Sequence, residues 1–318
     1  MGLIDRIRSG VSNTVNRIEN TAERVGGAVA NTAGRVGGAV ANTAGRVGGA
    51  VADGFDKAKN VATGVVGAVN PFGRTADSRN DGLMVGRGGQ TFPPNTPLSQ
   101  VPAFQPVDGV RNNTTVIYTN GIQTDLAGQT ASLQAIANTT GSRVVGVHNA
   151  TDGFAADLRQ CVQDKLDKGR NPAVDTLANT IYNEIKAGNP VHLMGHSQGG
   201  LVTSRALQHV QQRLRAEDGM TKAQAEQAMG NIKVETFGAA ATSYPNGPQY
   251  VHYVNRADPV PSMFGLSPIA DKWNPLVDGG RGSKVIHFNE AHLNPINAHS
   301  FESVYLNRRQ EFDQARAQ

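Results

Sequence analysis

The segment VHLMGHSQGGLV, residues 191–202, constrains the fold of this chain more than any other. Val191 to Met194 is a mainly apolar run typical of a buried strand, and a helical pattern begins at Gly199. Between them, Gly195, Ser197 and Gly199 stand in a G-x-S-x-G frame. This spacing suits a sharp strand-to-helix turn, which lifts the serine oxygen above a sheet while flanking glycines avoid side-chain clashes. We therefore predict that Ser197 is a nucleophile, and the alternative is an ordinary turn serine.

Short β-branched runs alternate with longer helical stretches from Thr114 onward. The predicted strands are Thr114–Tyr118, Arg143–His148, Val191–Met194, Ile232–Thr236, Tyr250–Asn255 and Lys284–Phe288. The predicted helices are Leu126–Asn138, Phe154–Lys168, Val174–Ala187, Gly199–Arg215, Lys222–Ala228 and Phe301–Ala315. This order is typical of an α/β fold, with a mostly parallel sheet of about six strands and helices on both faces.

A serine nucleophile needs a base to take its proton, and that base needs a partner to fix its tautomer. We favour His299 as the base, because it opens the last predicted helix on a loop long enough to fold back over the sheet. His292 and His287 remain alternatives, although His287 is expected in a strand. The other histidines are expected to be packed within elements, with His196 held beside Ser197 and pointing away from the site.

The acid is expected in the loop after the preceding strand. Asp258 follows the strand Tyr250–Asn255 by three residues, and prolines at 259 and 261 stiffen the chain beyond it. Asp271 and Asp278 are alternatives, but both lie far from a predicted strand end. The simple alternative for Asp258 is a solvated turn aspartate.

The chain order Ser197, Asp258, His299, each after a successive strand, resembles the α/β-hydrolase superfamily over roughly residues 112–316. The segment DPVP after the acid strand and a histidine at the start of a terminal helix look like bacterial lipase and phospholipase members. The resemblance implies an acyl-enzyme mechanism with these three residues as the triad. It is specific for fold and triad, and much less so for substrate.

The resemblance also implies an oxyanion hole. Its donors would be the backbone N–H of Gln198 and that of Ile122, beside Gly121, or of a neighbour within residues 120–123. The loop YTNGIQTDLAG departs from the HGGG form of many esterases, and Asn120-Gly121 can also be a plain tight turn. Because two strands found in larger hydrolases have no counterpart here, we expect a reduced sheet.

A long segment, residues 262–282, interrupts the acid strand and the last strand. It holds the single tryptophan, Trp273, with several apolar residues, which is a large apolar content for a loop. It is interpreted as an acyl-pocket wall or lid, or else as ordinary packing of a long loop.

The N-terminus carries an eleven-residue repeat. Residues 20–30, 31–41 and 42–52 read NTAERVGGAVA, NTAGRVGGAVA and NTAGRVGGAVA. A period of eleven matches three helical turns and places the valines on one stripe, as in the lipid-surface helices of synucleins, which these repeats resemble. Two or three glycines per repeat oppose a helix in water. We predict an arm over residues 1–70 that is disordered or becomes helical on a membrane or partner; a coiled stalk is the third possibility.

Composition separates the remaining regions. Residues 71–110 carry six of the 15 prolines and are predicted to be an extended linker, so that residues 111–318 form the catalytic domain. The net charge of +4 lies in the first 90 residues, and residues 91–318 balance, which disfavours nucleic-acid binding.

Several classes of protein are excluded or disfavoured by residue types. Cys161 is the only cysteine, so neither an intrachain disulfide nor a cysteine-type zinc site is possible. No metal or nucleotide cofactor motif occurs, and none is expected. The sequence MGLIDRIRSG lacks the apolar core of a Sec signal, and Val61–Val69 is too short to span a bilayer. We expect a cytoplasmic protein, or one exported by a signal-independent route.

The resemblance implies a serine hydrolase of carboxylic esters, with lipid or phospholipid acyl esters favoured. An exported or injected antibacterial lipase would fit this analogy, with a secretion apparatus or an immunity protein as partner. One alternative is an acyltransferase or thioesterase with the same triad. Another is a protein that binds a membrane surface or a partner through its repeats and carries a vestigial hydrolase body.

Overall fold

The computed structural model describes residues 78–122, 124–150, 171–266, 277–293 and 295–318. By contacts the chain divides into two compact units, residues 1–73 and 74–318, and all described residues belong to the second. The predicted repeat arm and the predicted helix Phe154–Lys168 lie outside the described residues.

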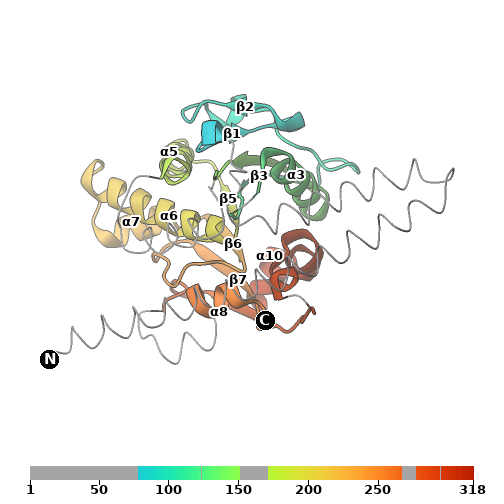
Figure 1. The fold of residues 1–318 in the computed structure, drawn as a ribbon. Coiled ribbons are helices and arrows are strands. Elements are labelled where there is room, and N and C mark those ends of the chain that lie inside the picture. The colour runs from blue at the N-terminus through green and yellow to red at the C-terminus, as the bar shows by residue number, and fades with distance from the viewer. Residues whose placement is uncertain (1–77, 123, 151–170, 267–276, 294) are drawn as a thin grey trace, which may run out of the picture. The chain divides into compact units, whose positions relative to one another are not determined.

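Eight strands form one mostly parallel sheet in the order β2-β1-β4-β3-β5-β6-β7-β8 (Figure 1). The strands are β1 (Met84–Val85), β2 (Thr91–Phe92), β3 (Asn112–Thr119), β4 (Ser142–Val147), β5 (Val191–His196), β6 (Ile232–Phe237), β7 (Gln249–Asn255) and β8 (Lys284–Phe288). Strands β3 to β8 pair in parallel and are the six strands that the sequence predicts. The predicted α/β fold class is thus confirmed.

The strands β1 and β2 correct the expectation of a six-stranded sheet and of a plain linker. They pair antiparallel with each other, and β1 continues the sheet beside β4. Met84, Val101 and Phe104 are buried against this edge, and Phe104 forms a bridge with Val144. The region is rich in proline, so its sequence predicts a linker. Its apolar residues are nevertheless buried against the sheet edge. The folded unit therefore begins well before residue 110.

Helices cover both faces of the sheet (Figure 1). They are α3 (Leu126–Thr140), α5 (Pro172–Lys186), α6 (Gln198–Ala216), α7 (Lys222–Ala228), α8 (Pro259–Phe264) and α10 (Phe312–Ala317). Apolar side chains of α5, α6 and α7 pack on one face, in a core with those of β5 and β6. Those of α3, α10 and the chain before α10 pack on the other face. No helix among the described residues is long and apolar enough to cross a membrane.

Polar caps fix where these helices begin. The Asp125 side chain accepts from the backbone N–H of Gly128 at 2.7 Å, and Asn171 accepts from Val174 at 3.0 Å, directly before Pro172. Such caps satisfy N–H groups that have no acceptor inside the helix. The loops before α3 and α5 are therefore tied to their helices.

The predicted last helix, Phe301–Ala315, is broken into three pieces. A π-helical turn spans Phe301–Tyr305, a 3-10 turn follows at Leu306–Arg308, and α10 begins only at Phe312. The chain becomes extended at Arg309, where φ is −63° and ψ is 137°. This break turns the guanidinium of Arg309 toward the sheet, where it forms two-pronged hydrogen bonds with the carboxylate of Glu235.

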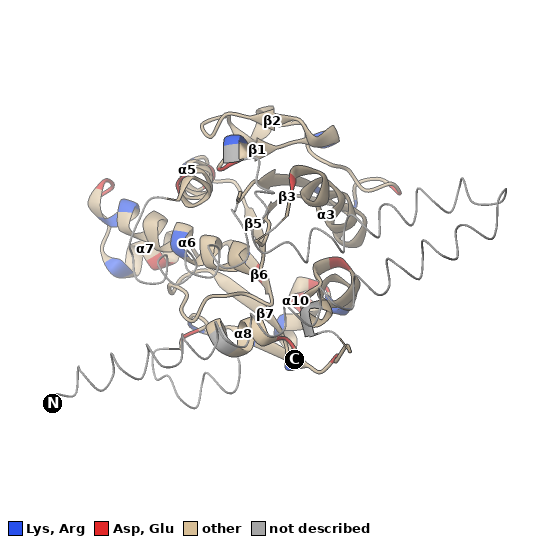
Figure 2. Ribbon diagram, viewed as in Figure 1, with Lys and Arg blue, Asp and Glu red and all other residues tan. Residues whose placement is uncertain are grey.

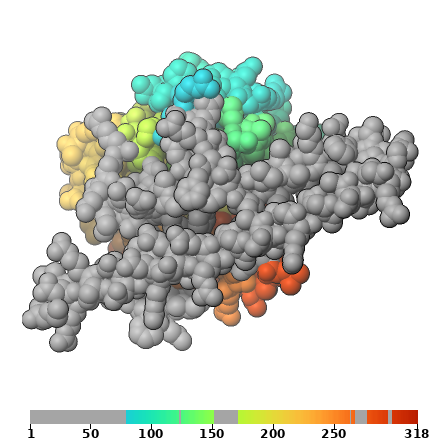
Figure 3. Space-filling view, viewed as in Figure 1, coloured from blue at the N-terminus to red at the C-terminus, as the bar shows by residue number. Residues whose placement is uncertain are grey.

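Several charged side chains outside the sheet form ion pairs. Figure 2 shows Lys and Arg beside Asp and Glu around α6 and α7. The ion pairs there are Arg213–Glu217, Lys222–Glu226 and Arg281–Glu226. Figure 3 shows the start of the described chain in cyan and a later part of the chain, in the colour range of β8, in orange at opposite ends of the face in view, as expected from the edge strands β2 and β8.

We predict that Arg309→Met destabilises the protein by about 3–5 kcal/mol, because it leaves a buried carboxylate without its cation. Glu235 is fully buried, and Arg309 is 3% exposed. Burial alone would raise the pKa of Glu235, but the charge of Arg309 and hydrogen bonds from His192 and Arg309 bring it below its ordinary value. Urea unfolding at pH 7 measures the loss.

The matched control is Lys233→Met, which removes the exposed ion pair between β6 and α10, Lys233–Asp313. It should cost less than about 1 kcal/mol. Because the folded pKa of Glu235 is lowered, the ion pair stabilises the protein fully above pH ~4.3, and this stabilisation is lost as pH falls from there through the folded pKa. The deficit of Arg309→Met should therefore shrink below pH ~4.3. Equal losses for both variants would contradict the assignment of a buried ion pair.

Candidate active site

Ser197 sits in a strained turn between β5 and α6. Its φ is 55° and its ψ is −123°, and it is the only non-glycine residue with positive φ in the described ranges. Its backbone N–H donates to the Phe237 carbonyl at 3.0 Å, and its carbonyl accepts from Ala240 at 3.0 Å. Such a conformation costs about 1–3 kcal/mol and persists only when the surroundings impose it. The turn places Ser197 at the carboxyl end of the sheet, where ligands bind in open α/β folds.

The glycines of the G-x-S-x-G frame allow three chain segments to cross. A Cβ on Gly199 would lie 2.1 Å from the Thr119 carbonyl oxygen, and one on Gly195 would lie 2.7 Å from the Gly199 carbonyl oxygen. Real Cβ atoms do not approach so closely. The turn therefore requires glycine at both positions, as the strand-to-helix interpretation expected.

The structure brings Asp258 and His299 together. His299 Nδ1 lies 2.5 Å from Asp258 Oδ2. Asp258 is also the N-cap of α8, and its Oδ1 accepts from the backbone N–H of Val260 at 2.8 Å. Because Nδ1 donates to the carboxylate, Nε2 is the ring atom left to accept a proton. Nε2 is buried and has no hydrogen-bond partner, and the ring of His196, the residue before Ser197, lies 4.6 Å from the His299 ring.

Tyr305 is a second donor to the same carboxylate oxygen, and the sequence gave no reason to expect it. Its hydroxyl donates to Asp258 Oδ2 at 2.5 Å and accepts from the backbone N–H of Asn255 at 3.3 Å. Burial, followed by the charge of Asp258 and this hydrogen bond, raises the pKa of Tyr305, so the hydroxyl keeps its proton. Tyr305 is the last residue of the π-helical turn, and this turn places its hydroxyl against Asp258. The regular helix predicted over 301–315 gave no indication of this contact.

The loop after β3 lies against the nucleophile turn. A Cβ on Gly121 would lie 2.8 Å from the Ser197 Cβ, so the backbone here passes directly beside Ser197. Ile122 follows along the chain and is half-buried. Gln198 begins α6, and its backbone N–H belongs to the first turn, where a helix has unpaired donors and the positive end of its dipole.

Two buried asparagines hold this loop in place. Asn120 Nδ2 donates to the carbonyls of Gly121 and Asn149, each at 2.9 Å, and its Oδ1 accepts from the Asn149 backbone N–H at 2.9 Å. Asn149 Nδ2 in turn donates to Gln198 Oε1 at 2.8 Å. The loop after β3, the loop after β4 and the start of α6 are thus linked. Asn149 directly follows the predicted strand Arg143–His148, and a polar residue at a strand end is a signal for a role near the site. No such role was predicted for Asn149 from the sequence.

The alternatives for base and acid lie apart from Ser197 or serve other roles. His292 is exposed and pairs with Glu290 at 3.6 Å, and His287 lies in β8. Asp278 holds its own loop, since its Oδ1 accepts from Gly280 and its backbone pairs with residues 242 and 244. Asp271, like Trp273 and the middle of the 262–282 segment, lies outside the described residues.

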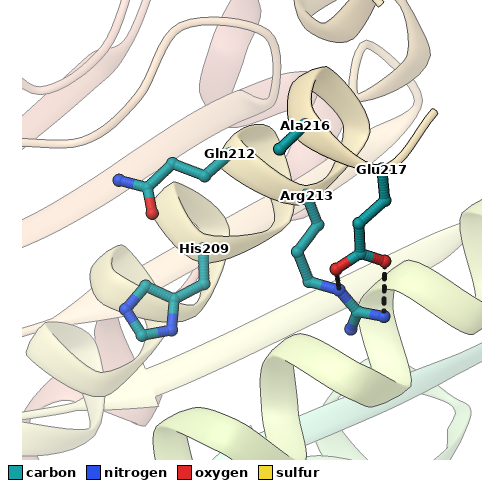
Figure 4. A pocket seen from close by; sticks show the side chains of 5 residues that line it. All are labelled: His209, Gln212, Arg213, Ala216 and Glu217. Carbon is teal, nitrogen blue, oxygen red and sulfur yellow. Dashed lines mark hydrogen bonds and ion pairs between the residues drawn. The ribbon is translucent and has the colours of Figure 1, made fainter. Parts of the chain in front are cut away.

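The structure describes no group of three or more His, Cys, Asp or Glu that could hold a metal ion. A surface depression of about 280 Å³ lies in the last turns of α6, lined by His209, Gln212, Arg213, Ala216 and Glu217 (Figure 4). Ser197 precedes the other end of α6, roughly 18 Å or more away along the helix. This depression is therefore separate from the site.

No protein-family model matches this chain, and no curated protein matches it either. Its backbone is similar to that of a Trichoderma reesei cutinase at 15% identity, with a TM-score of 0.28, over 64% of this chain and 73% of the cutinase. A dienelactone hydrolase from Anabaena variabilis gives 10% identity and a TM-score of 0.31, over 66% and 83% of the two chains.

A thioesterase from the prodiginine pathway of Streptomyces coelicolor gives 12% identity and a TM-score of 0.30, over 64% and 84%. All three TM-scores lie below 0.5.

We predict that Tyr305→Phe slows covalent labelling of Ser197 by a fluorophosphonate about 5- to 30-fold. The reason is that Asp258 loses a donor that helps to hold its carboxylate, equivalent to about 1–2 kcal/mol. The second-order rate of labelling, followed by mass spectrometry, measures the effect.

The control is Tyr253→Phe, which also removes a buried hydroxyl near the C-terminus. The Tyr253 hydroxyl bonds with the backbone of Gln310 and not with Asp258. Its labelling rate should stay within about twofold of wild type, although both variants lose about 1 kcal/mol of stability. Equal labelling rates for the two variants would show that Tyr305 is only structural.

Proposed function

We propose that this chain is a serine hydrolase of carboxylic esters, acting through Ser197, His299 and Asp258. The observation that carries the proposal is the coincidence of a strained serine turn with a buried carboxylate–imidazole pair next to it. A packing role does not require the strain of Ser197 or an unpaired Nε2 on His299. Their combination is the arrangement that activates a serine.

In this mechanism the Ser197 oxygen attacks the ester carbonyl while its proton passes to His299 Nε2. The resulting imidazolium is stabilised through Nδ1 by the Asp258 carboxylate. The negative charge on the former carbonyl oxygen is met by the backbone N–H of Gln198 and by that of Ile122 or a neighbour in residues 120–123. His299 then returns the proton to the leaving alcohol, and water, activated in the same way, releases the acid and regenerates Ser197.

Lipid or phospholipid acyl esters are the substrates that we propose. The support is the apolar composition of the 262–282 segment and the valine stripe of the repeats, which suit an amphiphilic substrate at a surface. The described ends of that segment are anchored, since Leu266 is buried in the core with apolar residues of α6 and Val277 packs against the same core. An exported enzyme acting on foreign membranes is one version of this proposal.

The test compares hydrolysis of short- and long-chain p-nitrophenyl esters, and then of phospholipid vesicles, by wild type and Ser197→Ala. We expect turnover that falls by on the order of 10⁴-fold or more in the variant, with a preference for the long chain or phospholipid. Preference for a thioester, or transfer to an alcohol instead of water, would favour the thioesterase or acyltransferase alternative. No turnover from folded protein would overturn the proposal.

A second prediction separates the candidate bases. His299→Ala should lower kcat by on the order of 10³-fold or more, because the proton of Ser197 then has no acceptor. His292→Ala, which removes an exposed histidine, should stay within about twofold of wild type on the same ester. A larger loss of kcat in His292→Ala than in His299→Ala would identify His292 as the base instead of His299.

The repeat arm is proposed to bring the enzyme to a membrane or to an export machine. A variant that lacks residues 1–73 removes the first unit and keeps β1 and β2, which belong to the sheet. Retained ester hydrolysis with lost binding to anionic vesicles would support an arm-guided enzyme. Unchanged vesicle binding would contradict the membrane role.

A further inference from the structure

The imidazole of His196 lies between the two halves of the candidate site. His196 ends β5 and directly precedes Ser197. Its Nε2 lies 2.9 Å from the backbone carbonyl oxygen of His299. Because a carbonyl oxygen can only accept, Nε2 carries the proton and donates it. On the other side of the ring, a Cβ on Gly121 would lie 3.1 Å from His196 Nδ1.

Two consecutive carbonyl groups of the chain that carries His299 accept hydrogen bonds from side chains at the ends of two strands. Asn255, the last residue of β7, donates from Nδ2 to the Ala298 carbonyl at 3.0 Å. His196, the last residue of β5, donates to the next carbonyl, that of His299. Leu293 and Asn297 are exposed, whereas Ala298 and Phe301, on either side of His299, are buried. The two side chains therefore add direct hydrogen bonds to the packing that places the backbone of His299.

We propose that His196 is a positioning residue of the hydrolysis reaction, which holds the backbone of His299 at a fixed place relative to Ser197. The inference rests on the proposed function. Asp258 fixes one end of the His299 residue at Nδ1, and His196 fixes the other end at the carbonyl. With both ends held, Nε2 has one direction in which to face the serine oxygen. A misplacement of about 1 Å at such a step can cost about 100-fold in rate.

The protonation state of His196 suits this role. Burial, followed by the nearby His299, lowers the pKa of His196 well below its ordinary value, although the hydrogen bond to the His299 carbonyl acts in the opposite direction. His196 therefore stays neutral while His299 gains and loses its proton. A cation at this distance, with ring centroids 4.6 Å apart, would oppose the imidazolium that the reaction forms.

The experiment separates the hydrogen bond from the ring. His196→Phe keeps an aromatic ring and removes the donor, whereas His196→Gln keeps an amide N–H at about the reach of Nε2 and removes the ring. For p-nitrophenyl butyrate we expect His196→Phe to lower kcat about 10- to 100-fold with KM within about twofold. His196→Gln should recover most of that loss. The fluorophosphonate labelling rate of Ser197 should follow kcat.

Circular dichroism and urea unfolding check that each variant is folded, and His196→Met, also without a donor, replaces His196→Phe if the latter is not. Wild-type kcat in a folded variant without a donor would overturn the inference, as would equal losses in His196→Phe and His196→Gln. If wild type itself neither hydrolyses the ester nor labels at Ser197, the proposed function fails instead.

Discussion

The candidate site depends on one buried carboxylate. Asp258 is fully buried, and a charge in that position is tolerated only with several donors around it. It receives them from three separate parts of the chain: the first turn of α8, the loop that ends at His299, and the π-helical turn that ends at Tyr305. Satisfying this carboxylate therefore links three segments that follow β7. The base is held by the same interaction that makes the acid acceptable in the core.

Polar residues at the ends of parallel strands perform the remaining positioning. Asn120 follows β3, Asn149 lies just after β4, His196 ends β5, and Asn255 ends β7. Each side chain donates a hydrogen bond to the backbone of another loop. Because buried amides and imidazoles must find partners, they tie loops that otherwise have few apolar contacts to the rigid sheet. These side chains fix the positions of the site loops relative to the sheet.

The sequence predicts the parts of the structure that local patterns specify. The six parallel strands and the turn at Ser197 follow from apolar runs and from glycine spacing, which depend on neighbours in the chain. The strands β1 and β2 were missed because their two-residue lengths carry no periodicity and prolines surround them. The break at Arg309 was missed because it depends on Glu235, which lies 74 residues away in the sequence. Contacts of this kind cannot be read from a local pattern.

The same distinction applies to the site. Asp258 and His299 could be placed because chain order and strand ends locate them, and their contact is then a matter of topology. Tyr305 and His196 could not, since their contacts depend on a π-helical turn and on the path of a loop backbone. The strained residue, Ser197, and the residue that bonds to the His299 backbone, His196, are adjacent in the chain. The sheet must be rigid enough to hold Ser197 in an unfavourable conformation. His196, the residue before Ser197, is held by the same strand end, and its hydrogen bond to the His299 carbonyl connects the base to that strand.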